Sequence, residues 1–350
     1  MMRILPKDNP YLIGHEKAEK LFLEAYRAGT LHHAFLIEGR LGIGKATFAY
    51  KIARFLLEEK NGAENRQTLD VSPTSSAFLQ ISNGAHPNFK AIEKDYIETD
   101  KKKIIKAIKD GEPLDEASLQ NLKKSSVIKI DDVREIRSFF SKKSFDGSWR
   151  VVLIDSADDL NPASANAILK VLEEPPAKSM ILLVCNNPNT LLATIKSRCL
   201  RLSLEPLSEE NVATLLRRYA PELSEREVSG LAKISGGSIG DALNYAQNNG
   251  LALYEKMQSV FGAGTRFNLK TALDLANTGA ADDEVFELMI SLMLQFVFEM
   301  SLGGKEKAKF AEIYTHILCL KNEVVALNMD KKQALLNTFY LIAKEVSNAC

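Results

Sequence analysis

The residues from 39 to 46 form the motif of this chain that carries the most chemistry. They read Gly-Arg-Leu-Gly-Ile-Gly-Lys-Ala. In the phosphate-binding pattern G-x-x-x-x-G-K-S/T, glycine amides surround the phosphates, the lysine reaches the terminal phosphates, and the hydroxyl binds Mg²⁺. The residues expected to bind a nucleotide are Gly39, Gly42, Gly44 and Lys45. Ala46 stands where the hydroxyl belongs, so one part of this chemistry is missing.

A second group that could act on the same nucleotide is the carboxylate of Asp155, which ends an apolar run over residues 151–154. In a phosphate-loop protein, such a strand-terminal Asp lies near the metal. An ATPase usually follows this Asp with a Glu that orients the attacking water, whereas Ser156 follows it here. The alternative is a buried strand that merely ends in Asp, and the loop upstream makes that interpretation the weaker one.

These residues require a parallel sheet to position them. Apolar runs at 34–38, 151–155 and 180–185 are typical of buried strands. Apolar residues at helical spacing follow the loop from Lys45 to Glu59. Strands that alternate with helices predict an α/β domain with a parallel sheet over residues 1–205.

Two polar stretches interrupt this domain. Residues 61–84 contain Asn-Gly and Ser-Pro pairs and predict a surface loop. Residues 95–124 are dense in charge and predict a solvated insertion. A DNA-facing role for Lys101–Lys103 is the alternative interpretation of that insertion.

The pattern becomes helical in the second part of the chain. Ser224 and Glu227 form a capping box that opens one helix, and Ser238 can cap a short helix after it. We expect a small three-helix lid over residues 206–249. Residues 250–350 predict an all-helical C-terminal domain, because they contain no further strand pattern.

The most apolar stretch, residues 285–300, is too short for a clean membrane span. Every fourth position carries a polar residue, which places one polar stripe along a helix. The stripe consists of Glu287, Ser291, Gln295 and Glu299. This helix is expected in a protein core or an oligomer interface. The N-terminus lacks the apolar segment of a secretion signal, so no membrane partner is predicted.

Composition limits the possible partners and the compartment. Lys and Arg together number 45, as do Asp and Glu, so the chain has no overall basic field for nucleic acid. Any contact with DNA would be local or shared with partner proteins. The four cysteines lack C-x-x-C spacing, which argues against a zinc site or a disulfide framework and favours reduced thiols in a cytoplasm. They are Cys185, Cys199, Cys319 and Cys350.

Three further segments have a distinctive order and spacing. They read Asn-Ala-Ile-Leu-Lys-Val-Leu-Glu-Glu-Pro-Pro at 166–176, Ile-Leu-Leu-Val-Cys-Asn-Asn-Pro at 181–188, and Thr-Ile-Lys-Ser-Arg-Cys at 194–199. Together they resemble the AAA+ subunits of the bacterial DNA polymerase III clamp loader, over about the first 245 residues. The resemblance implies an α/β P-loop (AAA+) domain, a helical lid and a helical collar that joins sister subunits. Beyond residue 245 only helical content and length agree.

The resemblance assigns further positions of the nucleotide site. Thr47 stands one position too late for the metal ligand, and Asn186 stands at a sensor position where its polar side chain could still serve. Gly240 occupies the place of a lid arginine that contacts the γ-phosphate. With Ala46 and Ser156 this makes three losses along one site, so we expect no hydrolysis by this chain. Among these subunits the chain is most similar to the delta prime type, whose own ATP site is eroded in the same way.

Nucleotide binding is a separate question, because Gly42, Gly44 and Lys45 keep the anion-binding loop. Two alternatives stay open: ATP or ADP bound without hydrolysis, or an empty loop. No cofactor is required in either case. An alternative function is an active ATPase, either a gamma/tau-like motor subunit or another AAA+ remodeller, in which Thr47 and Asn186 would serve. A free-standing DNA-binding regulator is a third, which the balanced charge disfavours.

Arg198, in the Ser-Arg-Cys triplet, is retained. In the family this arginine projects into the ATP site of the adjacent subunit and stabilises charge during hydrolysis, as an arginine finger in trans. The alternative is a surface arginine on a helix-to-strand turn. The implied partners are the gamma/tau and delta sister subunits and, through the complex, the sliding clamp and primer–template DNA.

Many delta prime subunits carry a cysteine-rich zinc module after the P-loop helix. This chain has no cysteine from Met1 to Val184, so we predict no zinc and no other structural metal. His32, His33 and His86 are then expected to cap or pack rather than to bind a metal.

Overall fold

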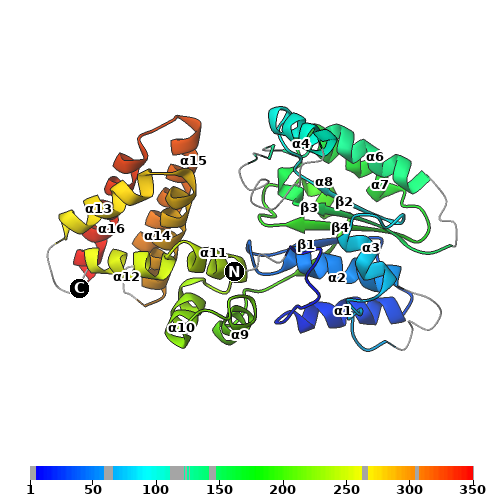
Figure 1. The fold of residues 1–350 in the computed structure, drawn as a ribbon, viewed down its shortest axis with the longest axis horizontal. Helices are drawn as coiled ribbons and strands as arrows, with labels where there is room; N and C mark the ends of the chain where they lie inside the picture. The colour runs from blue at the N-terminus through cyan, green and yellow to red at the C-terminus, as the bar shows by residue number, and fades with distance from the viewer. Residues whose placement is uncertain are drawn as a thin grey trace. The chain divides into compact units, whose positions relative to one another are not determined.

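The computed structural model describes the chain except for residues 1–4, 59–65, 111–121, 123, 126, 142–146, 262–266, 304–306 and 350. The chain divides into two compact units (Figure 1). The N-terminal unit ends at Pro206 and the C-terminal unit begins at Leu207.

The N-terminal unit is built on a five-stranded sheet. Its strands are β1 (Ala34–Glu38), β2 (Phe89–Glu93), β3 (Arg150–Asp155), β4 (Ser179–Cys185) and β5 (Leu200–Ser203). The order is β2-β3-β4-β1-β5, and all neighbours pair in parallel. The predicted α/β domain with a parallel sheet is therefore confirmed. The apolar runs predicted β1, β3 and β4, whereas the two edge strands β2 and β5 carry too many exposed residues to be found in that way.

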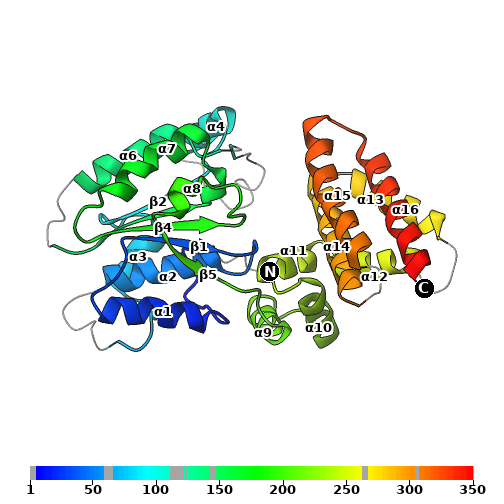
Figure 2. The ribbon, with the colours of Figure 1, turned by 180° about the vertical axis from the view of Figure 1, so that it is seen from behind.

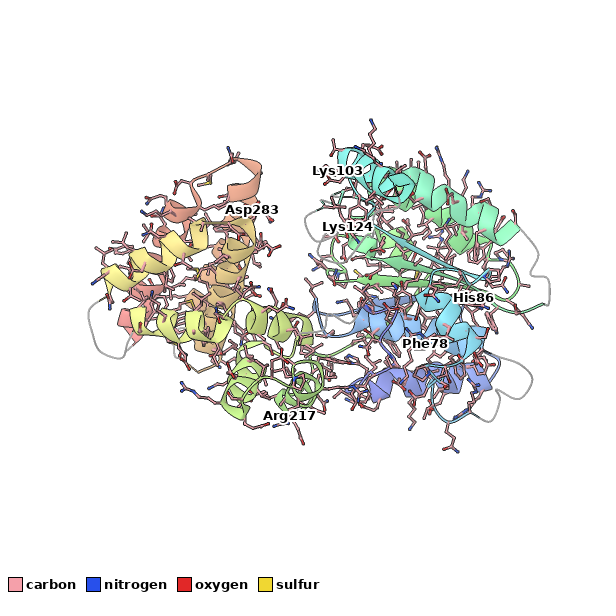
Figure 3. All side chains as sticks on the ribbon, viewed as in Figure 1. Phe78, His86, Lys103, Lys124, Arg217 and Asp283 are labelled. Carbon is pink, nitrogen blue, oxygen red and sulfur yellow. The ribbon has the colours of Figure 1, made fainter. Side chains whose placement is uncertain are left out.

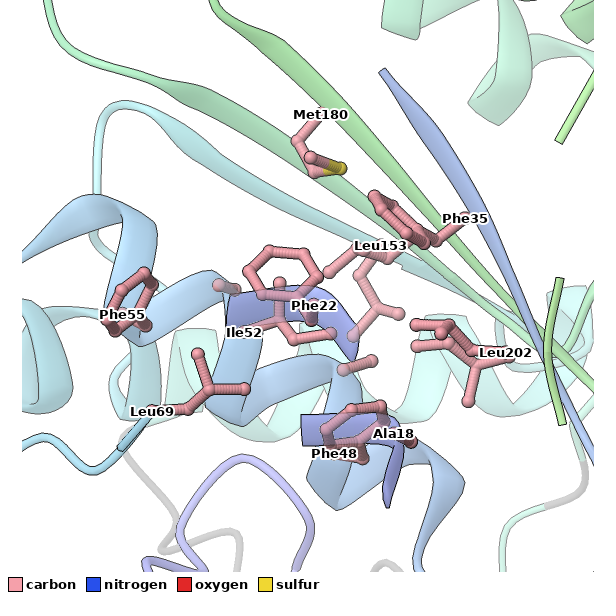
Figure 4. Close-up of a cluster of buried hydrophobic side chains, with 14 of the residues drawn as sticks. Ala18, Phe22, Phe35, Phe48, Ile52, Phe55, Leu69, Leu153, Met180 and Leu202 are labelled. Carbon is pink, nitrogen blue, oxygen red and sulfur yellow. The ribbon is translucent and has the colours of Figure 1, made fainter. Parts of the chain in front are cut away.

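Helices cover both faces of this sheet (Figures 1 and 2). One face carries α1 (Glu16–Arg27), α2 (Lys45–Leu57) and α3 (Ser76–Ser82), and the other carries α6 (Ile130–Ser141), α7 (Pro162–Glu173) and α8 (Ala193–Lys196). The helix α4 (Glu98–Asp110) lies near α6. Side chains of successive strand residues point to opposite faces, so each buried strand supplies both cores. Phe35 packs against Phe22 in the first core, which also contains Phe48 (Figure 4), while Leu36 belongs to the second.

The segment predicted as a surface loop over residues 61–84 contains the helix α3, so that prediction is wrong for Ser76–Ser82. Ser75 caps this helix, because its hydroxyl accepts from the backbone N–H of Phe78 at 3.1 Å. Phe78 (Figure 3) is buried, and the guanidinium carbon of Arg54 lies 4.0 Å from its ring centroid. A short apolar face and a cation–π contact order this segment. Residues 61–65, and residues 111–121 and 123 of the predicted insertion over 95–124, lie outside the described residues.

The described part of the C-terminal unit is helical. Its helices are α9 (Glu209–Tyr219), α10 (Glu225–Ile234), α11 (Ile239–Gln247), α12 (Gly250–Val260), α13 (Leu269–Ala280), α14 (Asp283–Gly303), α15 (Lys307–Ala326) and α16 (Lys331–Ala349). The predicted capping box of Ser224 and Glu227 is present, and Ser238 caps α11. The division of this part into a lid over 206–249 and a collar over 250–350 stays a prediction.

The polar stripe of α14 binds side chains from two other helices of this unit. The Tyr245 hydroxyl of α11 lies 2.7 Å from Ser291 Oγ, and the Tyr254 hydroxyl of α12 donates to Glu299 at 2.8 Å. By length and composition Asp283–Leu302 could cross a membrane, but half of that stretch is buried within the unit. The stripe therefore fastens helices within a protein core, as expected for residues 285–300.

Candidate functional site

The phosphate-binding loop lies at the edge of the sheet where the parallel strands end. The register pairs Glu38 of β1 with Cys185 of β4, and Val184 of β4 with Asp155 of β3. The backbone N–H of Gly39 donates to the Cys185 carbonyl at 3.3 Å. The sheet therefore brings together the loop, Asp155 and the residues that follow β4, although they are far apart in the sequence.

Three glycines of the loop, Gly39, Gly42 and Gly44, have backbone conformations that other residues rarely adopt. Gly39 has φ +152°, and a Cβ there would lie 2.5 Å from the carbonyl oxygen of Leu204. Gly44 has φ +105° and directly precedes α2, so no side chain caps that helix. The first amides of α2 are thus left for an anion, and the helix dipole favours negative charge at the same place. This is a phosphate-binding geometry.

Lys45, the first residue of α2, is 4% exposed. Its Nζ donates to the backbone carbonyl of Arg40, within the same loop. Burial lowers the pKa of Lys45 to about 8, although Asp158 and Asp155 act in the opposite direction. A phosphate at the loop would replace a weak acceptor with a strong one and would raise this pKa.

Asp155 ends β3 near the same lysine. Burial raises the pKa of its carboxyl to about 6, Glu93 adds to that rise, and Lys45 opposes it. A buried carboxylate at a strand end costs stability, and proteins retain such groups mostly at functional sites. The structure thus places Asp155 where a bound cation would compensate the burial of its carboxylate.

We expect Asp155→Asn to stabilise the N-terminal unit at pH 8 by about 1–3 kcal/mol. The pKa of Asp155 is higher in the folded state than in the unfolded state, where it is near 3.8. The carboxyl therefore stabilises the fold at pH values below 3.8, and this contribution is lost as the pH rises through about 6. The difference between variant and wild type should therefore vanish near pH 3. Trp149, the one tryptophan of the chain, lies in this unit and reports its unfolding in urea. Equal stabilities at pH 8 would contradict the prediction.

Asp158, which sequence reasoning missed, lies at the centre of a hydrogen-bond network beyond β3 and β4. Its carboxylate accepts from Ser156 Oγ at 2.5 Å, Asn186 N at 2.6 Å, Asn187 N at 2.8 Å, Cys185 Sγ and Asn186 Nδ2 at 3.2 Å each, and Thr190 Oγ1 at 3.4 Å. Burial by itself would raise the pKa of Asp158, but these donors outweigh it and lower the pKa. A carboxylate has about four lone-pair sites, so this one has none left for a water.

The same network occupies the two positions that an ATPase would use beside Asp155. Asn186 Nδ2 donates to Ser156 Oγ at 2.9 Å, and Ser156 donates onward to Asp158. Thr47 is buried in α2, and Ala46 before it offers no hydroxyl. The strands and the loop are thus brought together as predicted. The side chains of Ser156, Asn186 and Asp158, however, are hydrogen-bonded to one another.

Arg198 lies at a different place in the N-terminal unit, after α8. Its side chain is 36% exposed and pairs with Glu173 at the end of α7, with 2.9 Å between Nη2 and Oε1. Nη1 donates to the Thr194 carbonyl at 3.0 Å and lies 3.4 Å from Ser197 Oγ. Gly240, by contrast, belongs to α11 of the C-terminal unit.

The histidines of the N-terminal unit bond mainly to backbone. His33 Nε2 lies 3.0 Å from the Leu172 carbonyl oxygen, His32 Nδ1 lies 2.8 Å from that of Ala34, and His86 Nδ1 accepts from Asn88 N at 3.2 Å. Among the described residues, no group of three or more His, Cys, Asp or Glu side chains is placed to bind a metal. These contacts are those of packing and capping residues.

Comparison with known proteins finds one matching family model and several similar relatives. The model of the family described as "DNA polymerase III, delta subunit" matches residues 14–208, more than half of the chain. DNA polymerase III subunit delta' of Escherichia coli K12 is 29% identical over 231 residues, which cover 66% of this chain and 59% of the relative. Subunit gamma of Buchnera aphidicola subsp. Schizaphis graminum is 26% identical over 247 residues, 69% of this chain and 58% of the relative. Both matches thus span less than two thirds of the relative.

Among solved structures, a gamma-subunit-related protein of Thermotoga maritima shares 17% identity, with a TM-score of 0.42, over 93% of this chain and 99% of its own. Relatives named delta' and relatives named gamma match at similar identity. The family model, the parallel sheet and the phosphate-binding loop agree with one another. The chain therefore belongs to the DNA polymerase III, delta subunit family and is a clamp-loader subunit of the AAA+ class.

Proposed function

We propose that this chain is a delta prime subunit that does not hydrolyse ATP and that supplies Arg198 in trans to a neighbour's ATP site. The assembled loader would place a sliding clamp on primed DNA during replication. The observation that carries the proposal is the contrast between two sites. The chain's own nucleotide site has lost the groups that hydrolysis requires, whereas Arg198 is retained and lies at the surface.

The loss of hydrolysis rests on the groups around the loop. Ala46 removes the metal hydroxyl, and Ser156 replaces the carboxylate that would orient water. Asp158 cannot take over that role, because six contacts already occupy its oxygens. By the resemblance to the family, Gly240 has the sequence position of the lid arginine that active relatives carry. Each such loss reduces turnover by about a hundredfold to a thousandfold.

The role of Arg198 rests on its chemistry and its position. A guanidinium is planar and permanently charged, and it can donate two parallel hydrogen bonds to a phosphate, which lysine cannot. The side chain of Arg198 is partly exposed and its Nε–H donates to no other residue in the described part of the chain. A phosphate of another subunit could therefore reach it.

We also propose that the loop binds ATP or ADP without hydrolysing it. Bound phosphates would raise the pKa of Lys45 from about 8, so binding at pH 8 should take up about half a proton per nucleotide. Titration calorimetry in two buffers of different ionisation enthalpy measures this uptake, and Lys45→Met should abolish it. Binding without proton uptake would contradict the assignment of Lys45 to the phosphates.

The proposed partners are the gamma/tau and delta sister subunits, with the clamp and primer–template DNA reached through the complex in a bacterial cytoplasm. Relatives of this chain are DNA polymerase III subunits, which supports such a complex. Affinity purification of the tagged chain from its own cells, followed by mass spectrometry, tests the assembly. Recovery without any AAA+ sister subunit would argue against it.

An active motor subunit is the second candidate, because relatives named gamma and tau match at similar identity. It predicts that the purified chain turns over Mg·ATP by itself. The proposed function predicts that it does not.

A further inference from the structure

Three acceptors converge on the guanidinium of Arg198. The Thr194 carbonyl, in the only turn of α8, and Ser197 Oγ lie at Nη1, and the Glu173 carboxylate lies at Nη2. Glu173 belongs to α7, more than twenty residues earlier in the sequence. The side chain of Arg198 is thus held at one end, while the edge that carries Nε–H has no partner among the described residues.

Glu173 occupies a position that does not favour a carboxylate. It is the last residue of α7, where unpaired carbonyl groups make the helix end negative. A cation is preferred there, and Arg198 supplies one from outside the helix. The contact with Arg198 is the one hydrogen bond or ion pair of the Glu173 side chain within the described structure. The helix itself therefore gives no reason for the carboxylate.

We propose that Glu173 is a positioning residue for Arg198, which it holds in place with the Nε–H free for the phosphate of a neighbouring subunit's nucleotide. This inference rests on the proposed function of Arg198. A flexible arginine must lose rotamer freedom when it binds a phosphate, and a side chain already held in place loses less. The side chains of the pair are 36% and 48% exposed, so it is a surface ion pair that a phosphate can join at little cost.

The alternative is that Glu173 sequesters Arg198 and must release it. The two hypotheses predict opposite changes in the rate of hydrolysis when Glu173 is removed. Removal of a positioning residue slows hydrolysis at the neighbour's site, whereas removal of a sequestering residue accelerates it. The three contacts occupy Nη1 and Nη2 and leave Nε–H without a partner among the described residues, so a phosphate can bind while Glu173 keeps its contact, which favours positioning.

The experiment compares Glu173→Ala, Glu173→Gln and the matched control Glu174→Ala in the reconstituted loader. Glu174 is the next residue, is also exposed, and has no side-chain hydrogen bond or ion pair in the described structure. With ATP, clamp and primed DNA, we expect Glu173→Ala to lower kcat about threefold to tenfold with KM for ATP nearly unchanged, as the loss of a surface ion pair predicts. Glu173→Gln keeps an oxygen acceptor and should retain at least half of the wild-type rate, and Glu174→Ala should match wild type.

A second comparison separates this inference from the function on which it rests. In an Arg198→Ala background, Glu173→Ala should have no further effect on kcat. The isolated chain that carries Glu173→Ala alone should unfold within about 2 °C of wild type. An unchanged or increased kcat for Glu173→Ala, or a loss that persists without Arg198, would overturn the positioning role alone. An Arg198→Ala loader with full activity would overturn both the role of Glu173 and the proposed function.

Discussion

Arg198→Ala in this chain is expected to slow ATP hydrolysis at the adjacent subunit's site by about a thousandfold, the lower range for loss of an arginine finger. The γ-phosphate gains negative charge as it transfers, and a guanidinium stabilises that charge more in the transition state than in the ground state. The affinity of the neighbour's site for ATP should therefore change much less than its turnover. Single-turnover hydrolysis is measured in the reconstituted loader. The phosphate-loop lysines of the other active sites are replaced, so that only the adjacent subunit's site contributes.

Arg201→Ala is the matched control for this experiment. Arg201 lies three residues further on in β5, its side chain is 52% exposed, and its Nε lies 3.6 Å from Glu38. Its loss should leave turnover within about twofold of wild type, because a half-exposed side chain with an ion-pair distance of 3.6 Å contributes little. Arg198→Lys should remain strongly impaired, since lysine cannot donate in the same planar geometry. Equal losses for Arg198 and Arg201 would indicate a general effect of surface charge and not a finger.

The purified chain alone should hydrolyse Mg·ATP at least about a thousandfold more slowly than an active AAA+ subunit, because each missing group costs a further factor. Phosphate release from saturating Mg·ATP, with a gamma-type subunit as the positive control, tests this expectation. Turnover comparable to that of the control would contradict it and favour the motor-subunit alternative.

Ala46→Thr separates binding from chemistry in the same assay. It restores the hydroxyl that binds Mg²⁺, so nucleotide affinity should become dependent on Mg²⁺. Hydrolysis should stay low, because Ser156 remains and Asp158 stays saturated. A large gain in turnover from this one substitution would show that the remaining losses matter less than we infer.

Local sequence patterns predicted the elements whose formation depends on the burial or the capping of neighbouring residues. The buried strands β1, β3 and β4 and the caps at Ser224 and Ser238 were found, because burial and capping leave a mark on neighbouring residues. The edge strand β5 was missed, since a strand with mostly exposed side chains has no apolar run. The helix around Phe78 was also missed, because it is short and its Phe78 packs against Arg54 of another helix.

At the candidate site too, the sequence predicted only the parts that are continuous along the chain. Spacing alone located the glycines, Lys45 and Asp155, because the loop and the strand end are continuous in sequence. The role of Asp158 as an acceptor from residues 185–190 depends on the pairing of β3 with β4, which the sequence pattern did not contain. The only signal was a second Asp three residues after Asp155. The contact of Glu173 with Arg198 likewise joins the end of α7 to the residues after α8, which meet only in the fold.

The most direct test uses two variants of this one chain in the same reconstituted loader. Steady-state hydrolysis with clamp and primed DNA is measured for Arg198→Ala and for Ala46→Asp, which places a negative charge at the phosphate-binding helix of the chain's own site. We predict that Arg198→Ala abolishes the contribution of the neighbouring site, while Ala46→Asp leaves turnover within about twofold of wild type. The opposite pattern, with loss for Ala46→Asp and full activity for Arg198→Ala, would show that this chain works through its own nucleotide and not through its neighbour's.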